Sequence, residues 1–540
     1  MNDQTETGAV GQEPTTPPPK QQEAKGWVIY PIGSRPKMGM AIMLGIQQYL
    51  TMFGATVLIP FIVAGAIGMP QHELALLIST MFFVSGIATL IQQSPLGNRL
   101  PIIQGGTFSF LGPMFAIVGI VATHGESGVI SFTEELPQWK YSIQQISVAV
   151  MFASVVEIVL GYSGIMGKVK RLIGPIVIGP TIALIGLGLF SIGAPWMASN
   201  WTISIMTLLA LILYSQVFSR KSRAFLLFPV LLAIITGWIL SALGTATGLI
   251  AEGNAANLKG GFGLIAAADW VNFLPVVPFK WGFPSLTSIT VAGAFGMLAG
   301  YLASMIESIG DYYACSRISE GPVPTERMIS RGLGAEGLSC LLAGIFQTGN
   351  GTTSYSENIG AIGLTRVASR RVIRAGACVM LILPFFGKFG AVLATMPKPV
   401  VGAMFVGLFG MIAAVGLSNL QFVNLNNSRN LFVIGISFFA GLSFPYHFNP
   451  MLSAGAAPIA WGAAGGFANV IGNILQAILT TPMAVTGIVA IILDNLLPGA
   501  TREERGLTVW EKDATEEAWE KAEAKWAKMA VGEERKIFIE

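Results

Sequence analysis

Long apolar stretches recur along almost the whole sequence and constrain the fold more than any other feature. A helix needs about 20 apolar residues to cross the hydrocarbon core of a bilayer, and fewer where a segment is broken. Fourteen stretches fit this description, which predicts an all-α integral membrane protein. They lie near 39–62, 73–93, 104–123, 144–164, 173–192, 201–217, 225–245, 288–312, 331–346, 356–365, 375–395, 400–416, 430–445 and 467–495.

The composition excludes several other classes of protein. Only 11% of the 540 residues are charged, whereas a soluble domain carries about 25%. An apolar content of 53% is too high for a disordered chain, and a net charge of +3 gives no case for nucleic acid. The three cysteines and three histidines lie far apart, so neither a metal site nor a disulfide framework is predicted.

The basic residues predict the orientation of the chain in the membrane. If the N-terminus is cytoplasmic, the predicted cytoplasmic loops hold 15 Lys and Arg residues and the outside regions hold five. Cytoplasmic loops of membrane proteins carry such an excess. We therefore expect a multi-pass protein of the plasma membrane with both termini in the cytoplasm.

The apolar stretches divide into two halves of seven spans, at 39–245 and 288–495. Because seven is odd, the second half enters the membrane from the opposite side. This topology is that of an inverted repeat, which is common in secondary transporters.

Two Gly/Ser/Thr-rich segments occupy the third position of each half. They lie at 104–110 and 349–358, and Phe108 and Glu357 are 249 residues apart, as are the starts of the halves at 39 and 288. Such composition favours extended chain over helix, and extended chain at membrane depth requires a cavity or protein around it. The segments predict paired broken helices whose free N–H groups bind a polar solute; the alternative is two ordinary extramembrane loops.

Acidic residues inside predicted spans mark function by default, because they are costly in a bilayer. Glu307 and Asp311 are four residues apart and share one helix face, and Glu357 lies at the start of the short span ten. Glu307 and Glu357 are predicted to be functional. Asp311 either supports Glu307 or ties helices together, and structural hydrogen bonds explain Glu157 and Glu336 equally well.

Three motifs resemble the nucleobase–ascorbate transporter family, which includes uracil and xanthine permeases. Residues 357–366 (ENIGAIGLTR) fit the signature of the family, and residues 307–314 (ESIGDYYA) are similar to its span-eight motif. Gln47-Gln48 with residues 52–56 (MFGAT) resembles the first-span motif. The resemblance extends over about residues 35–500.

The resemblance implies a fold of fourteen spans in two inverted repeats, with short strands in spans three and ten. It implies a core domain from residues 38–165 and 288–396, and a gate domain from 166–287 and 397–498 that mediates a homodimer. Residues 1–37 are expected to be a disordered cytoplasmic tail. Residues 499–540 are expected to be a cytoplasmic tail with a plain solvated helix.

The resemblance also implies roles for particular residues. The carboxylates of Glu307 and Glu357 would bind the polar edge of a planar base, and Asp311 would support Glu307 and proton coupling. Gln48 stands where many members have histidine, so a carboxylate-centred proton path is expected here. The remaining roles are backbone N–H donation to the base by Phe108 and Ser356, shaping of the slot by Phe108 and Tyr355, and bracing of span ten by Asn358 and Thr365.

The expected function is uracil import by proton symport with an elevator-type mechanism, and no cofactor besides the co-transported proton. Members with Glu at position 357 are commonly uracil carriers, whereas purine carriers more often have Gln or Asn and ascorbate carriers have Pro. Alternatives are a xanthine or purine carrier, a sodium-coupled nucleobase carrier, an anion carrier on the same fold, or a non-transporting receptor. An enzyme is not expected, because no nucleophile–base or metal constellation is present in the sequence.

Overall fold

The computed structural model describes residues 28–126, 131–169, 172–188, 190–284, 288–448, 471–472, 475–476, 478–510 and 515–528. Parts of three predicted segments lie outside the described residues. They are residues 1–27 of the predicted disordered tail, residues 467–470 of the predicted last span, and residues 529–540 of the predicted cytoplasmic tail.

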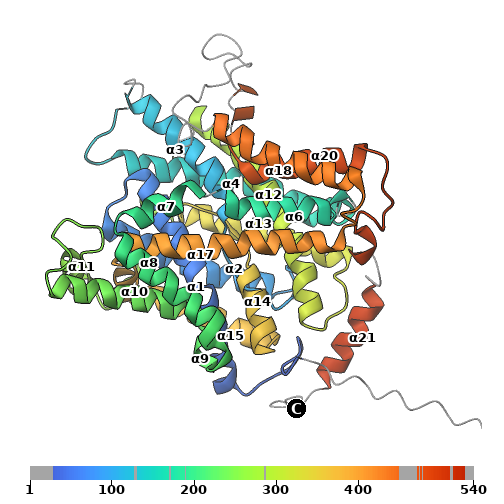
Figure 1. Cartoon of the computed structure of the whole chain (residues 1–540), viewed down its shortest axis with the longest axis horizontal. Helices are drawn as coiled ribbons and strands as arrows, with labels where there is room; N and C mark the ends of the chain where they lie inside the picture. The colour runs from blue at the N-terminus through green and yellow to red at the C-terminus, as the bar shows by residue number, and fades with distance from the viewer. Residues whose placement is uncertain are drawn as a thin grey trace, which may run out of the picture.

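The described residues fold into a bundle of helices (Figure 1) around one two-stranded sheet. The first part comprises α1 (Met38–Ile67), α2 (Gln71–Gln92), β1 (Gln104–Gly106), the 3-10 helix η1 (Phe108–Phe110), α3 (Leu111–Glu126), α4 (Gln138–Tyr162), α5 (Ile165–Val169), α6 (Pro175–Leu187), α7 (Phe190–Ala198), α8 (Trp201–Ile212), α9 (Arg223–Leu227), α10 (Pro229–Ala246) and α11 (Lys259–Ala267). The second part comprises α12 (Ser288–Ile318), α13 (Glu326–Ile345), β2 (Thr352–Ser354), α14 (Ser356–Thr365), α15 (Arg370–Ile382), α16 (Gly387–Ala394), α17 (Lys398–Ser418), α18 (Ser428–Phe448), α20 (Pro482–Leu496) and α21 (Glu516–Ala527).

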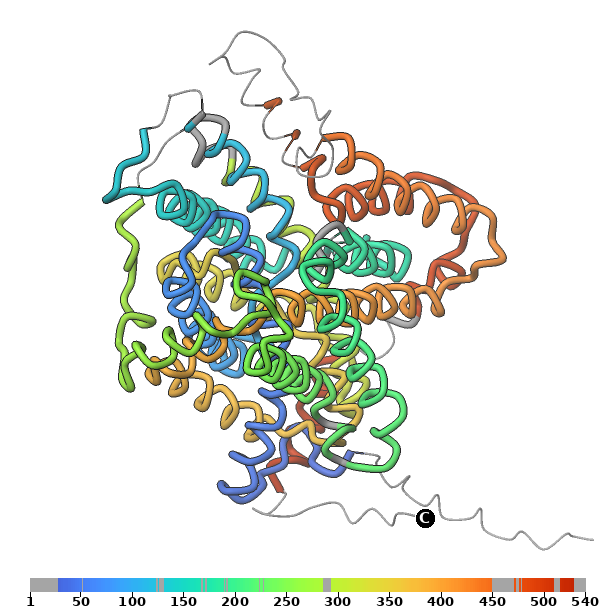
Figure 2. The backbone as a smooth tube through the Cα atoms, turned by 60° about the vertical axis from the view of Figure 1, so that its left-hand side comes forward, coloured from blue at the N-terminus to red at the C-terminus, as the bar shows by residue number. Residues whose placement is uncertain are grey.

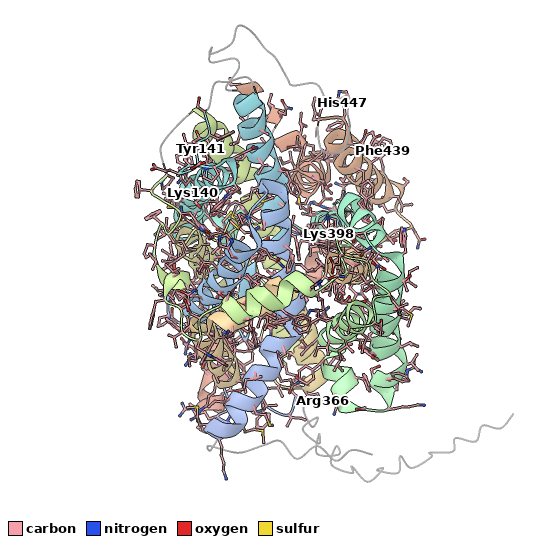
Figure 3. All side chains as sticks on the ribbon, turned by 90° about the vertical axis from the view of Figure 1, so that its left-hand side faces the viewer. Lys140, Tyr141, Arg366, Lys398, Phe439 and His447 are labelled. Carbon is pink, nitrogen blue, oxygen red and sulfur yellow. The ribbon has the colours of Figure 1, made fainter. Side chains whose placement is uncertain are left out.

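The helices are apolar on the outside as well as in the core. Six helices among the described residues are long and apolar enough to cross a membrane, or up to eight if each of two bent pairs is one span. Large apolar side chains also face outward; Phe439 on α18, for example, is 73% exposed (Figure 3). Such a surface suits lipid rather than water. The mostly helical membrane fold is therefore as predicted, while the count of fourteen spans stays a prediction.

The two Gly/Ser/Thr-rich segments meet as a short antiparallel sheet. Gln104 pairs with Ser354, Gly105 with Thr353, and Gly106 with Thr352. The prediction of short strands in these two segments is confirmed. Each strand is followed by a helix that starts beside the sheet, η1 and α3 after β1 and α14 after β2.

The described helices pack in two groups. The strand-bearing group contains both strands, α1–α5 and α12–α16; in it α4 packs along α13 and α12, and α15 packs on α1 and α2. The strand-free group contains α6–α10, α17, α18 and α20; in it α17 packs on α6, α7 and α8. Helices α18 and α20 lie side by side at the edge of this group (Figure 2). A division of the molecule into core and gate domains stays a prediction.

Residues 28–34 are packed, although the sequence places them in a disordered tail. Val28 and Ile32 are fully buried. The backbone N–H of Ile29 donates to the carbonyl oxygen of Arg366 at 2.9 Å, and Tyr30 forms a β-bridge with Val367. This segment is ordered because its run of apolar residues packs against the end of α14 and the start of α15.

Helix α21 is also packed, so the expectation of a plain solvated tail helix is wrong. Trp519 and Trp526 are each 5% exposed, and the indole N–H of Trp519 donates to the carbonyl oxygen of Val323 at 2.9 Å. Glu523 forms an ion pair with Arg370 at 2.6 Å. The indole rings bury apolar surface against the strand-bearing group, which a helix free in water cannot do.

Candidate functional site

A cavity of about 380 Å³ lies between the two helix groups. Its wall from the strand-bearing group, called the polar wall, carries the polar side chains among some apolar ones and comes from α1, β1, η1, α12, β2 and α14. Its wall from the strand-free group is apolar and comes from α6, α9, α10 and α17. The polar wall includes Thr107, Phe108, Glu307, Thr353, Ser356 and Glu357, and the apolar wall includes Ile182, Leu226, Val230, Leu408, Met411 and Ile412.

Two carboxylates line the polar wall. Glu307, on α12, is half-buried, and its Oε2 accepts a hydrogen bond from the hydroxyl of Ser109 at 3.2 Å. Glu357 is half-buried in the first turn of α14, where backbone N–H groups have no partner within the helix. The structure therefore brings to one cavity two acids that are 50 residues apart in the sequence.

Phe108 and Tyr355 shape the cavity, and a glycine makes room for one of them. Tyr355 packs over β1, where a Cβ on Gly105 would lie 2.6 Å from its ring. The Tyr355 hydroxyl is 3.3 Å from that of Thr56 on α1. The Phe108 ring meets Phe409 of α17 edge-to-face, with 4.8 Å between ring centroids. Phe108 therefore contacts both helix groups at the edge of the cavity.

Asp311 lies behind the polar wall rather than in it. Its Oδ1 accepts a hydrogen bond from Ser356 at 2.7 Å, and its Oδ2 accepts one from Ser354 at 3.1 Å. Asp311 is within electrostatic range of Glu307. Its direct contacts hold the junction between β2 and α14, which carries Glu357.

Gln48, Asn358 and Thr365 form a brace that does not line the cavity. The Asn358 amide donates to Gln48 Oε1 at 2.9 Å, and Gln48 Nε2 donates to Thr365 Oγ1 at 3.3 Å. Asn358 Oδ1 accepts from the backbone N–H of Ile103 at 2.9 Å. These bonds connect α14 to α1 and to the segment before β1.

Sequence reasoning gave no specific role to Glu336, which lies at the centre of the polar network. This fully buried side chain on α13 accepts hydrogen bonds from Ser308 at 2.6 Å, Tyr312 at 2.8 Å and Gln104 at 3.2 Å. Its position in mid-helix among glycines was the available signal. The apolar wall was also missed, because Leu408 or Met411 in a membrane span has no distinguishing local feature.

The charge of the cavity limits the solutes that it suits. Glu307 and Glu357 are within electrostatic range of each other, and none of the described residues lining the cavity is Lys, Arg or His. No group of three or more His, Cys, Asp or Glu residues that could hold a metal ion occurs in the part of the chain that the structure describes. The arrangement favours a solute that donates hydrogen bonds over an anion.

Comparisons with known proteins identify the family. A family model for xanthine/uracil permeases, described as "Permease family", matches residues 39–450. The chain is 43% identical to "Solute carrier family 23 member 2" of Mus musculus, over 90% of this chain and 76% of that protein. The chain belongs to the nucleobase–ascorbate transporter family. It is 34% identical to "Nucleobase-ascorbate transporter 1" of Arabidopsis thaliana, over 90% of this chain and 92% of that protein.

The fold is also similar to that of a solved structure. A solved structure titled "The overall structure of SLC26A9" matches with a TM-score of 0.52 and 12% identity, over 75% of this chain and 63% of that chain. The family resemblance predicted from three motifs is confirmed, and the chain is a multi-pass membrane transporter of this family rather than an enzyme.

Proposed function

We propose that this transporter imports a nucleobase, with uracil as its first candidate substrate, and couples import to protons. The observation that carries the proposal is the pair of carboxylates, Glu307 and Glu357, in a cavity with no cation among its described lining residues. Uracil presents ring N–H donors beside carbonyl acceptors. The carboxylates accept the N–H bonds, and the backbone amides at Phe108 and Ser356 donate to the carbonyl oxygens.

The two walls of the cavity suit a flat heterocycle. The edge of the base faces the polar wall, and its faces contact Phe108 and the apolar side chains of the strand-free group. A volume of about 380 Å³ is at the lower end of small-molecule sites. This volume admits a base of one or two rings, so xanthine is the second candidate, because its edge offers a similar arrangement of donors and acceptors.

Ascorbate is a weaker candidate substrate, although the name of the plant relative includes it. Ascorbate is an anion at neutral pH. It would lie against Glu307 and Glu357 without a cation among the described lining residues to offset the repulsion.

The packing of the molecule supports an elevator-type movement. The strand-bearing group, as a core domain, would carry the base across the membrane against the strand-free group, as a gate domain that forms a homodimer. The apolar wall from Ile182, Leu408 and Met411 offers the base no directional bonds, so this wall does not hold the base in one position.

The fourteen-span topology with cytoplasmic termini belongs to the same proposal, for a protein of the plasma membrane. It requires Arg366 to face the cytoplasm, and Lys140 and His447 to lie at the outside. Figure 3 has Arg366 at one end of the molecule and the other two residues toward the opposite end, which supports this orientation.

Uptake of radiolabelled uracil tests the proposal in cells that lack their own carrier. Saturable uptake, competition by unlabelled uracil and loss of accumulation with a protonophore are expected. Competition by ascorbate but not by uracil or xanthine would contradict the substrate assignment. Uptake that requires sodium and resists the protonophore would contradict the coupling.

A further inference from the structure

Glu157 is a buried acid to which the proposed substrate site gives no role. It lies on α4, its side chain is 1% exposed, and neither carboxyl oxygen has a hydrogen-bond partner among the described residues. An ionised carboxylate without partners in such surroundings is very costly. Glu157 is therefore neutral in this conformation, which means that it holds a proton.

The groups around Glu157 are acidic or neutral. Those within its electrostatic range are Glu336 and Cys340 on α13, and Tyr301 and Tyr312 on α12. None of these four side chains can supply a positive charge to pair with an ionised Glu157. A negative Glu336 nearby further favours the neutral form of Glu157.

Close packing of two helices brings the two acids together. Helix α4 packs along α13, and a Cβ on Gly337 would lie 2.7 Å from the backbone nitrogen of Ile158 and 3.2 Å from the carbonyl carbon of Glu157. Gly337 directly follows Glu336. The absence of a side chain at this position lets the backbones approach, and Glu336 is within electrostatic range of Glu157.

Glu336 has the hydrogen bonds of an ionised carboxylate, unlike Glu157. Its Oε1 accepts from Tyr312 and Gln104, and its Oε2 accepts from Ser308. The Tyr312 hydroxyl itself accepts from Gln92 at 3.1 Å, so its own proton points to Glu336. Of these two neighbouring acids, Glu336 with three donors is therefore the better site for a negative charge, and Glu157 with none is the better site for a proton.

A continuous series of side chains connects Glu336 with the cavity. The hydroxyl of Ser308, which donates to Glu336 at 2.6 Å, lies 3.0 Å from that of Ser354. Ser354 lies 3.1 Å from Asp311 Oδ2, and Asp311 Oδ1 accepts from Ser356 at 2.7 Å. Ser356 lines the cavity. Hydroxyl and carboxyl groups at these distances can pass a proton by exchanging donor and acceptor roles.

A second recess lies where α4 ends and α13 begins. It has a volume of about 500 Å³, and Tyr162, Arg327, Ser330 and Arg331 line it. The positive-inside rule assigns this end of the helices to the cytoplasm. Glu157 is five residues before the end of α4, and Glu336 is five residues after Arg331, which is about 7.5 Å along each helix axis. Both acids therefore lie at a similar depth from this recess.

We infer that Glu157 is a proton-carrying group on the path between the substrate cavity and the cytoplasm and exchanges one proton with Glu336. In the transfer step, a side-chain movement brings the two carboxyl groups within hydrogen-bond distance, and a protonated Glu336 and an ionised Glu157 become an ionised Glu336 and a protonated Glu157. The hydrogen bonds of the structure fit the state after this step. Ionised Glu157 forms again when its proton leaves through the recess. This inference rests on the proposed proton coupling and adds the Glu157 carboxyl group to it.

The test compares two activities of the purified full-length protein in liposomes. Exchange of labelled for unlabelled uracil needs substrate movement but no net proton transfer, whereas accumulation driven by a pH gradient needs both. Glu157→Gln keeps the shape of the neutral acid but cannot carry a proton. It is expected to retain exchange and to lose gradient-driven accumulation. Accumulation equal to that of the parent protein would overturn the inference.

Ser339→Ala is the matched control, because Ser339 is a buried polar residue of α13 that cannot titrate and bonds only within its own helix, to Ala335 at 2.8 Å. It is expected to retain both activities. If Glu157→Gln does not fold, Glu157→Asp keeps an acid but shortens it, and a several-fold loss of accumulation with exchange preserved is expected. An unchanged ratio of accumulation to exchange in this variant would also overturn the inference.

Measurements on the parent protein distinguish a failure of this inference from a failure of the proposed function. If the parent exchanges uracil but a pH gradient drives no accumulation, proton coupling itself is wrong, and the role of Glu157 fails with it. If the parent accumulates uracil and Glu157→Gln does so equally well, only the role of Glu157 is wrong. If uracil is not exchanged at all, the substrate assignment is wrong, and the same comparison with xanthine still tests Glu157.

Discussion

Glu357 and Gly105 show how single residues form the cavity. Glu357 supplies a carboxylate at the start of a half-length helix, where the first backbone N–H groups have no carbonyl partner within the helix. Gly105 supplies no atoms but allows the Tyr355 ring to lie on β1. The first residue acts through its charge and the second through its lack of a side chain, so different substitutions test them.

Glu357→Gln is expected to reduce uracil uptake at low substrate concentration by about 10- to 100-fold. The amide loses one hydrogen bond to a charged group, worth about 1.5–3 kcal/mol, and about 1.4 kcal/mol is a factor of ten. Initial uptake rates with matched surface expression measure the effect. Glu517→Gln, at an exposed acid of α21, is the control and should leave uptake unchanged. Parental uptake by Glu357→Gln would remove Glu357 from the site.

Gly105→Ala is expected to abolish most uptake without preventing membrane insertion. The new methyl group would lie 2.6 Å from the Tyr355 ring, so either the ring or β1 must move. The matched control is Gly119→Ala on α3, where a methyl group meets nothing within 4 Å. Uptake assays on both variants show whether the contact between Tyr355 and β1 is needed for transport. An equal loss of uptake in both variants would contradict the role given to Tyr355 packing.

Helix α14 depends on its neighbours for its position. It has only 10 residues, and isolated helices of fewer than about 12 residues are marginal in water. Asn358 ties it to Gln48 on α1 and to the backbone of Ile103, while Ser356 ties it to Asp311 on α12. The direction of Glu357 therefore depends in part on hydrogen bonds to Gln48, Ile103 and Asp311, which do not line the cavity.

Asn358→Ala is expected to lower both the Tm of the purified transporter and the rate of uracil uptake. The change leaves the buried N–H of Ile103 without its acceptor, which costs about 1–3 kcal/mol. Thermal unfolding and uptake measure the two effects. Asn426→Ala, in an exposed loop, is the control. A normal Tm together with normal uptake would show that α14 is held by packing alone.

The C-terminal region contacts both helix groups, which matters for the molecule as a whole. Near the strand-free group, Asp494 of α20 forms ion pairs with Arg429 at 2.6 Å and with Arg505 at 2.8 Å. Farther along, α21 packs on the strand-bearing group through Trp519 and Trp526. A relative movement of the two groups therefore has to change the distance between α20 and α21 or break the contacts of one of them.

Replacing both Trp519 and Trp526 by Ala is expected to detach α21. The substitutions remove the largest apolar contacts of this helix, so a protease should cleave at 515–528 much faster in the intact transporter. The KM for uracil should stay unchanged, because α21 does not line the cavity. Limited proteolysis with mass spectrometry checks the first outcome and uptake kinetics the second. Lys521→Ala, at an exposed position of α21, is the control. Unchanged proteolysis of the double variant would contradict the docking.

Part of the site could be predicted from residues near one another in the sequence. The extended segments at 104–110 and 349–358, which hold β1 and β2, were predicted because Gly, Ser and Thr in an apolar context disfavour helix. Glu307 and Glu357 were found because acids are rare in spans. The three donors to Glu336 and the lack of any donor to Glu157 could not be predicted, because these contacts join helices far apart in the chain.

The sequence by itself determined that this protein crosses a membrane, where two of its helices break, and which family it belongs to. These properties are local, because hydropathy, glycine content and short motifs act over a few turns of chain. Only the tertiary structure decided that β1 and β2 pair, that α6, α9, α10 and α17 face the carboxylates, and that α21 is docked. In a bilayer, side chains that face lipid are as apolar as those that face another helix. Composition therefore does not reveal which surfaces meet, and shape and close packing decide it.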